Sequence, residues 1–144
     1  MSSHRIIGLF LVCLGVVCVA QSQETKPQVK HAAAPQTSAA SGKEMFNAYC
    51  ASCHGADAKG DGPAAAALKS KPADLTLLAK DNGGKFPANR VMSILHGQAT
   101  VTAHGNRDMP VWGPVFWHMS QGHPAEVQQR VTNLTKYIES LQAK

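Results

Sequence analysis

The chain has 144 residues and a formal net charge of +5 at pH 7. Its lysines stand among Ala, Pro and Gly instead of forming a helical stripe, and no nucleic-acid-binding motif accompanies them, so the charge does not indicate a nucleic-acid partner. The basic residues of the central region are Lys59, Lys69, Lys71, Lys80 and Lys85. They are either a solvated surface or a set of charges that steers an acidic protein partner.

The first 20 residues have the three parts of a secretory signal. Arg5 supplies the positive charge, residues 6–20 are free of charge, and small residues lie near the end of that run. The run is shorter than the about 18 residues expected of a membrane-spanning helix, although an uncleaved anchor, and thus a membrane tether, stays open as an alternative. We therefore expect export, to the periplasm, with loss of residues 1–20 and of Cys13 and Cys18 in them.

Residues 21–40 consist mostly of Gln, Ala, Pro, Ser, Thr and Lys, with almost no large apolar side chain. Such a composition cannot bury enough surface to order itself, so we expect a flexible leader. Residues 41–144 suit one domain, and no internal repeat is visible. Removal of the signal leaves Cys50 and Cys53 as the cysteines of the exported protein, so a disulfide framework is not expected.

A helix is predicted to start at Ser41, which forms a capping box with Glu44 ahead of an apolar face. The helix ends in a C-x-x-C-H sequence, in which Cys50, Cys53 and His54 project from one face. This motif is typical of covalent haem c attachment, in which both thiols bond the porphyrin edge and the imidazole ligates the iron. A single motif predicts a single haem.

Three other interpretations of Cys50 and Cys53 are weaker. A redox dithiol of the C-x-x-C type expects a βαβ neighbourhood rich in Val and Ile, which this sequence lacks. A structural zinc site needs four ligands, and no second cysteine pair follows. A structural disulfide across this tight spacing is the third alternative.

Further helices are predicted downstream of the motif. A short one runs through Leu75–Leu78, and another begins near Pro87 and ends at Gly97. Residues 98–123 are irregular and rich in Gly and Pro, so they are expected to form a long loop. A final amphipathic helix begins at Pro124. Since no segment alternates like a strand, the predicted fold class is all-α, with about four short helices and long loops.

An iron held by His54 needs a second axial ligand, and Met109 is the best candidate. It lies inside the predicted loop, where the backbone can fold over the haem and Pro110 stiffens the approach. Methionine ligation raises the reduction potential and closes the iron to oxygen and peroxide, which favours an electron carrier. Met109 as a flexible core residue is the alternative. The other candidate ligands are Met119, His96, His104, His118 and His123.

Together these features resemble a class I monohaem cytochrome c domain, over residues 41–142. The resemblance is carried by the C-x-x-C-H motif and by four further segments. These are Gly60-Asp61-Gly62-Pro63, Lys71-Pro72-Ala73-Asp74-Leu75-Thr76, Met109-Pro110 and Tyr137-Ile138-Glu139-Ser140-Leu141-Gln142. The resemblance implies a cytochrome c-like fold wrapped around one covalent haem c, with the first and last helices crossing at Gly42.

The resemblance also implies roles for residues around the haem. Pro63 matches the proline whose carbonyl holds the proximal imidazole in this family, and Arg90 and Trp112 are candidates for contacts with the haem propionates. For Arg90 and Trp112, a surface arginine and a core tryptophan are interpretations of equal standing.

The expected function is one-electron transfer between exported or membrane redox proteins, without enzymatic activity and without a small-molecule substrate. One alternative is a haem c subunit of a larger dehydrogenase or oxidase, for which Trp112, Phe116 and Trp117 form either an interface or a haem wall. Another is an open-site haem enzyme or gas sensor, which requires an iron position that carbon monoxide can occupy.

Overall fold

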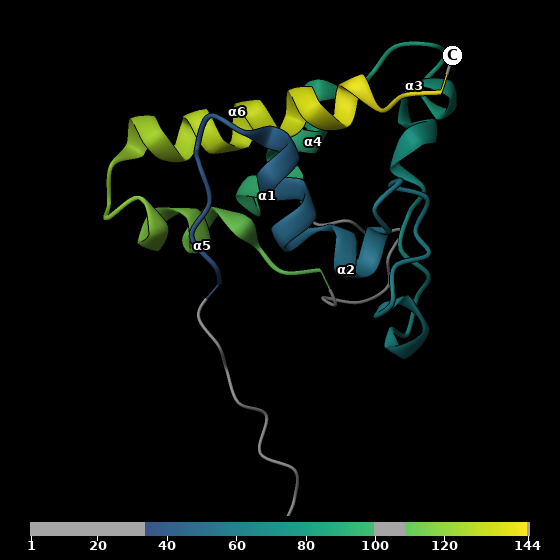
Figure 1. Ribbon diagram of the computed structural model, residues 1–144. Helices are drawn as coiled ribbons and strands as arrows, with labels where there is room; N and C mark the ends of the chain where they lie inside the picture. The colour runs from purple at the N-terminus through teal and green to yellow at the C-terminus, as the bar shows by residue number, and fades with distance from the viewer. Residues whose placement is uncertain (1–33, 100–108, 144) are drawn as a thin grey trace, which may run out of the picture. The chain divides into compact units, whose positions relative to one another are not determined.

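The computed structural model describes residues 34–99 and 109–143 of the chain (Figure 1). Every regular element in these two ranges is a helix, so the prediction of an all-α fold is confirmed. No helix within them is both long and apolar enough to cross a bilayer. The predicted signal, residues 1–20, lies outside the described residues. In chain order the elements, with η marking a 3₁₀ helix, are α1 (Gly42–Tyr49), α2 (Ala51–His54), η1 (Ala65–Ala67), η2 (Leu75–Leu77), α3 (Leu78–Asp81), α4 (Ala88–His96), α5 (Trp112–Met119) and α6 (Pro124–Ser140).

The start of α1 has half of the predicted capping box. The hydroxyl of Ser41 accepts from the backbone N–H of Glu44 at 3.1 Å, as expected of an N-cap. The carboxylate of Glu44, however, accepts from the N–H of Ser38 at 3.3 Å, while the N–H of Ser41 donates to the Ser38 carbonyl. The acid therefore ties the helix to the chain that precedes it.

The C-x-x-C-H motif forms its own short helix, because α1 ends one residue before Cys50. The N–H groups of Cys53 and His54 both donate to the carbonyl of Cys50, at 3.1 and 2.8 Å, which keeps the motif in one helical turn. Gly55, at φ +79°, ends α2 in a conformation that a side chain would strain. Cys50, Cys53 and His54 thus come from a single turn, as predicted.

Helices α1 and α6 cross closely, as the resemblance implies (Figure 1). A Cβ added to Gly42 would collide with the backbone carbonyl of Asn133 and lie 2.7 Å from the Cβ of Tyr137. The missing side chain lets the two backbones approach, and Phe46 then meets Tyr137 with ring centroids 5.4 Å apart. The crossing buries the apolar face of α6, whose innermost side chains include Val131 and Leu134.

The prediction of a continuous loop over residues 98–123 is wrong for its second half, which contains α5. Pro114 does not prevent this helix because it lies in the first turn, where backbone N–H groups have no intrahelical acceptor. Trp112 and Phe116, one turn apart, are both buried and hold α5 against the core. Residues 100–108 of the predicted loop lie outside the described part of the chain.

One side chain joins the end of α6 to the segment of η2 and α3. The amide of Gln142 accepts from the N–H of Ala79 at 2.8 Å and donates to the carbonyl of Leu75 at 2.7 Å. The N–H of Ala143 adds a bond to the carbonyl of Thr76 at 2.9 Å. These bonds satisfy backbone groups that the short helices leave unpaired, so the segment is held in place from outside.

Of the predicted flexible leader, residues 21–40, the part before residue 34 lies outside the described residues. Polar side chains of the domain bind the backbone of residues 34–40, which we call the strap. Asn133 donates to the carbonyl of Ala39 at 2.9 Å, and Arg130 donates to the carbonyl of Thr37 at 3.0 Å. Figure 1 shows this dark blue segment passing over α6 before it enters α1. Composition alone could not reveal this, since the partners come from α6.

Candidate functional site

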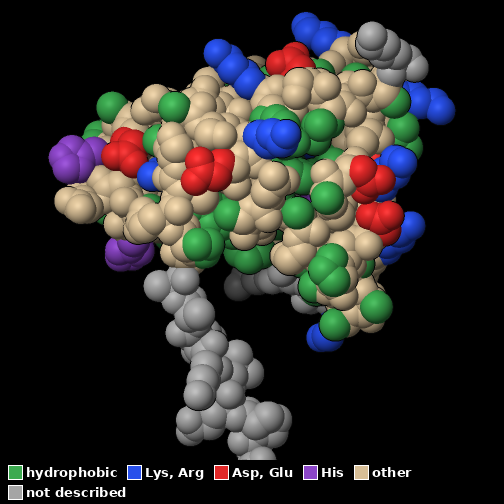
Figure 2. Space-filling model, in the orientation of Figure 1, with side chains coloured by type: hydrophobic (Ala, Val, Ile, Leu, Met, Phe, Trp, Pro, Cys, Tyr) green, Lys and Arg blue, Asp and Glu red, His purple; other side chains and the backbone are tan. Residues whose placement is uncertain are grey.

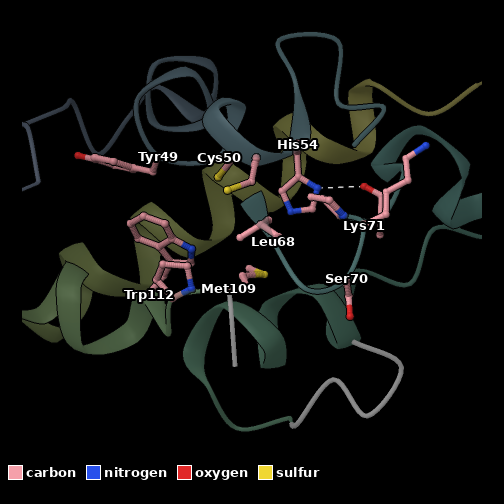
Figure 3. A pocket seen from close by; sticks show the side chains of 12 residues that line it. Tyr49, Cys50, His54, Leu68, Ser70, Lys71, Met109 and Trp112 are labelled. Carbon is pink, nitrogen blue, oxygen red and sulfur yellow. Dashed lines mark hydrogen bonds between the residues drawn. The ribbon is translucent and has the colours of Figure 1, made fainter. Parts of the chain in front are cut away.

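Two adjoining hollows lie beside the C-x-x-C-H turn, with volumes of about 340 Å³ and about 70 Å³. Four residues line both: Cys50, His54, Ala73 and Met109. We call the two together the crevice. The larger hollow is walled by η2, α3 and α4 and by Ile138 of α6, and the smaller one by the residues drawn in Figure 3.

The thiol of Cys50 lies in apolar surroundings and is 6% exposed, while Cys53 is half-buried. Burial, with a smaller contribution from Cys53, raises the pKa of the Cys50 thiol to about 12, so the group is uncharged at neutral pH. The two sulfurs are not joined in a disulfide. Across the described ranges no three His, Cys, Asp or Glu side chains gather as metal ligands, which leaves the zinc interpretation without a ligand set there.

His54 is held by a carbonyl other than the one expected. Its Nδ1 lies 2.9 Å from the carbonyl oxygen of Ala73, whereas the resemblance implied Pro63. The cause is the turn after α2, in which the N–H groups of Gly62 and Ala64 donate to the carbonyls of Cys53 and Ser52. These bonds hold the turn against the backbone of α2, so Pro63 is exposed and lines neither hollow.

The carbonyl of Ala73 reaches the imidazole because Ala58 and Gly60, in the turn after α2, contact the segment that contains Ala73. The N–H of Leu75 donates to the carbonyl of the buried Ala58 at 2.8 Å, which draws residues 73–75 toward the motif. Gly60 passes so close to the Pro72 carbonyl that an added Cβ would collide with it. Pro72 and Ala73 lie in a segment that carries the family resemblance, but the sequence gives no sign that the Ala73 carbonyl binds the imidazole.

Met109 comes to the same crevice as His54 from a distant part of the chain. It lines both hollows, and Figure 3 shows it entering the smaller one from the side opposite to the motif. Met119 lines neither hollow, since its sulfur lies 3.7 Å from the hydroxyl of Tyr49. The other candidate ligands that the structure describes, His96, His118 and His123, also lie away from the lining, and His104 is outside the described residues.

Arg90 and Trp112 both line the crevice, but at different hollows. Arg90 is exposed and lines the larger hollow, whose lining also includes Asp81 and Asn82. Trp112 is buried at the smaller hollow, and its ring is 5.2 Å from that of Tyr49 and 5.8 Å from that of Phe116. The apolar pattern of the first helix does not reveal that Tyr49 belongs to this aromatic wall.

The residues present fit a covalent haem. The crevice is lined mainly by apolar side chains, offers two thiols, and brings together an imidazole and a thioether, both of which serve as axial ligands of haem iron in proteins. A buried neutral thiol beside an apolar hollow also fits a cofactor whose ring is apolar.

Comparison with known proteins matches this chain to a family model and to a relative. The family model described as "Cytochrome C oxidase, cbb3-type, subunit III" matches residues 37–122, from the strap to the turn before α6. Cytochrome c-554(547) from Halothiobacillus neapolitanus is 32% identical over 105 residues, which are 72% of this chain and 96% of that protein. None of the solved structures gives a significant match.

Proposed function

This chain belongs to the monohaem cytochrome c family, and from that premise we propose that it carries single electrons between redox proteins through one haem c. The observation that supports this most is the convergence of His54 and Met109 on one crevice beside two thiols. In this proposal Cys50 and Cys53 attach the porphyrin by thioether bonds, and His54 and Met109 ligate the iron. A bound haem c supplies the chemistry, one electron exchanged between ferrous and ferric iron.

His54 is oriented by its bond to Ala73. Because a carbonyl only accepts, the 2.9 Å contact requires the proton on Nδ1, the tautomer whose Nε2 lone pair can bind a metal. A bond of this kind also makes the imidazole a stronger ligand. We therefore assign to Ala73 the role that the resemblance gave to Pro63.

Ligation of the iron by Met109 would distinguish an electron carrier from a haem enzyme. A thioether stabilises the reduced metal and raises the reduction potential, and two protein ligands leave no position for oxygen or peroxide. Arg90 and Trp112 complete the proposed site: the guanidinium that lines the larger hollow suits a propionate, and the indole closes the smaller hollow to water.

The partner class is other redox proteins. Figure 2 shows basic side chains scattered over one face of the protein, with acidic ones between them, and Lys59 pairs with Asp57 at 3.2 Å. Lys71 differs in that it lies at the lining of the smaller hollow, close to the proposed haem. A partner with an acidic docking surface is therefore expected, with modest electrostatic steering.

A second candidate function is that of a haem c subunit in a larger oxidase, which the description of the matching family model favours. Trp112 and Phe116 are buried, so an interface would have to rest on the exposed Trp117 and Val111, which are 47% and 50% exposed. Purification of the native protein distinguishes the two functions, because a permanent subunit brings its catalytic partner with it and a shuttle does not.

Export is part of this proposal, since cytochrome c domains are typically exported. We propose that residues 1–20 direct the chain there, and that the periplasm or the outer face of a membrane is its location. Mass spectrometry of the mature protein checks this, because removal of the signal leaves a chain beginning near Gln21.

The experiment that tests the function is the visible spectrum of the oxidised protein, recorded with Met109→Ala and Met119→Ala beside it. We expect the iron–sulfur charge-transfer band in the wild type and in Met119→Ala, and its loss in Met109→Ala. An unchanged band in Met109→Ala rejects the assignment of the ligand. Ready binding of carbon monoxide by the ferrous wild type rejects the carrier in favour of an open-site haem protein.

A further inference from the structure

Arg130 is a charged side chain that is only 3% exposed, and its guanidinium faces the strap. It donates from Nη1 to both the carbonyl and the hydroxyl of Thr37, at 3.0 and 3.2 Å, and from Nη2 to Glu126 at 2.8 Å. Its Nε lies 3.3 Å from the hydroxyl of Ser120. Burying a cation costs free energy unless it is paired and hydrogen-bonded in this way. The buried position of Arg130 therefore suggests that it has a specific role.

The hydroxyl of Thr37, which binds Arg130, is also hydrogen-bonded to the hydroxyl of Tyr49. The two hydroxyl oxygens are 2.7 Å apart, and the hydroxyl of Tyr49 is 2.6 Å from the carbonyl of Pro35. Counting protons fixes the direction of each bond. Arginine can only donate and a carbonyl can only accept, so Arg130 donates to Thr37, Thr37 donates to Tyr49, and Tyr49 donates to Pro35.

The ring of Tyr49 lies at the other end of this chain of bonds, in the wall of the crevice. Tyr49 directly precedes Cys50, and both Tyr49 and Trp112 line the smaller hollow. Their ring centroids are 5.2 Å apart, and Phe116 packs against both at 6.0 and 5.8 Å. Fixing the hydroxyl therefore fixes the tilt of a ring that packs against the indole.

We propose that Thr37 and Arg130 are positioning residues for the haem crevice, acting through the hydroxyl of Tyr49 on the wall formed by Tyr49 and Trp112. This inference rests on the proposed function. A tightly held wall keeps water from the haem edge, and exclusion of water disfavours the more highly charged ferric state. In this proposal the strap keeps the reduction potential of the haem high, and it also stabilises the fold.

The strap has a second attachment point, at Asn133. It allows the structural role of the strap to be tested separately from its effect on Tyr49. Asn133 binds the carbonyl of Ala39 without contacting Thr37 or Tyr49 in any bond that the structure gives. Loss of this anchor loosens the strap but leaves the bonds from Arg130 to Tyr49 in place.

The test compares Thr37→Val, which keeps the shape and removes the hydroxyl, with Thr37→Ser, which keeps the hydroxyl. Both are made in the full chain with haem attached, and the reduction potential and the thermal midpoint are measured for each. We expect a lower potential in Thr37→Val and in Tyr49→Phe, and the wild-type potential in Thr37→Ser. Asn133→Ala is expected to lower the thermal midpoint while leaving the potential unchanged.

Three outcomes overturn the inference. Equal potentials in Thr37→Val and Thr37→Ser show that the hydroxyl does not act on the haem. A shift in Asn133→Ala as large as that in Thr37→Val shows that only the attachment of the strap matters. A wild-type protein without bound pigment rejects the proposed function itself, and with it this inference.

Discussion

Glu126 is the residue that makes the buried charge of Arg130 tolerable. Its carboxylate accepts from Nε and Nη2 of Arg130 at 3.2 and 2.8 Å, one helical turn away on α6. The hydrogen bond from Arg130, followed by smaller contributions that include Ser120 and His123, lowers the pKa of Glu126 below its ordinary value of 4.5. The ionised acid is therefore favoured in the folded protein.

The sign of this shift predicts an acid-dependent stability. A carboxyl whose pKa is lower in the folded state contributes stability above its unfolded pKa, and that contribution is lost as the pH falls through the folded value. We expect Glu126→Gln to lower the thermal midpoint at pH 7, with a difference from the wild type that shrinks as the pH falls below about 4.5. Thermal unfolding followed from pH 7 down to acid pH measures this.

Glu139→Gln is the matched control, since Glu139 is an exposed acid on the same helix. Its midpoint should follow that of the wild type at every pH. A Glu126→Gln variant whose deficit stays constant into acid would contradict an electrostatic origin and point to packing.

For single residues, the sequence predicts the side chains of the candidate site but not the backbone groups that orient them. The motif points to Cys50, Cys53 and His54 because covalent attachment of a haem would require this spacing within one turn. The partner of the imidazole depends on how the turn after α2 folds back, which brings Ala73 forward and leaves Pro63 outside. That choice is tertiary, so a short motif does not contain it.

Among the elements, the crossing of α1 and α6 depends on one missing side chain. Alanine is favoured over glycine by about 1 kcal/mol inside a helix, but a Cβ at Gly42 would collide with the Asn133 carbonyl. Overpacking of this kind costs about 1–3 kcal/mol, and backbone atoms cannot rotate away. We expect the clash to win, so Gly42→Ala lowers the free energy of unfolding, as denaturant titration measures.

Asn47→Ala on the exposed side of α1 gives the comparison. It has a somewhat smaller gain in helix propensity, at most about 0.7 kcal/mol, and no collision, so it should leave stability unchanged or slightly higher. If Gly42→Ala is as stable as Asn47→Ala, the two helices do not depend on close approach.

Two elements show where sequence patterns fail. The pattern of glycine and proline in residues 110–114 indicates a loop. Pro114, however, falls in the first turn of α5, where it removes no intrahelical hydrogen bond. The strap has no apolar pattern at all and is ordered by polar bonds to Arg130 and Asn133. By contrast, α4 and α6 follow their apolar periodicity and their terminal signals, because local sequence and burial agree there.

At the scale of the whole molecule, the crevice opens onto the hydrophobic core. Cys50, Val91, Leu95 and Ile138 line the larger hollow and also belong to that core. An apolar cofactor in this space would cover these side chains, so folding and haem attachment are expected to be coupled. The double variant Cys50→Ser with Cys53→Ser, which cannot hold the porphyrin covalently, is expected to lose the cooperative thermal transition of the wild type.

Circular dichroism during heating measures that coupling. The single variant Cys53→Ser keeps one attachment point and should fall between the two. A double variant that unfolds as sharply as the wild type and at the same temperature would mean that the helices alone form a complete core.

The bonds of Gln142 to the η2 and α3 segment predict an order of events during the proposed export. An exported chain that crosses the membrane with its amino-terminal part first presents Cys50 and Cys53 before the side chain of Gln142. Until the end of α6 has also crossed, Gln142 cannot fix the η2 and α3 segment that lines the larger hollow, so a haem could enter beside His54 during that interval.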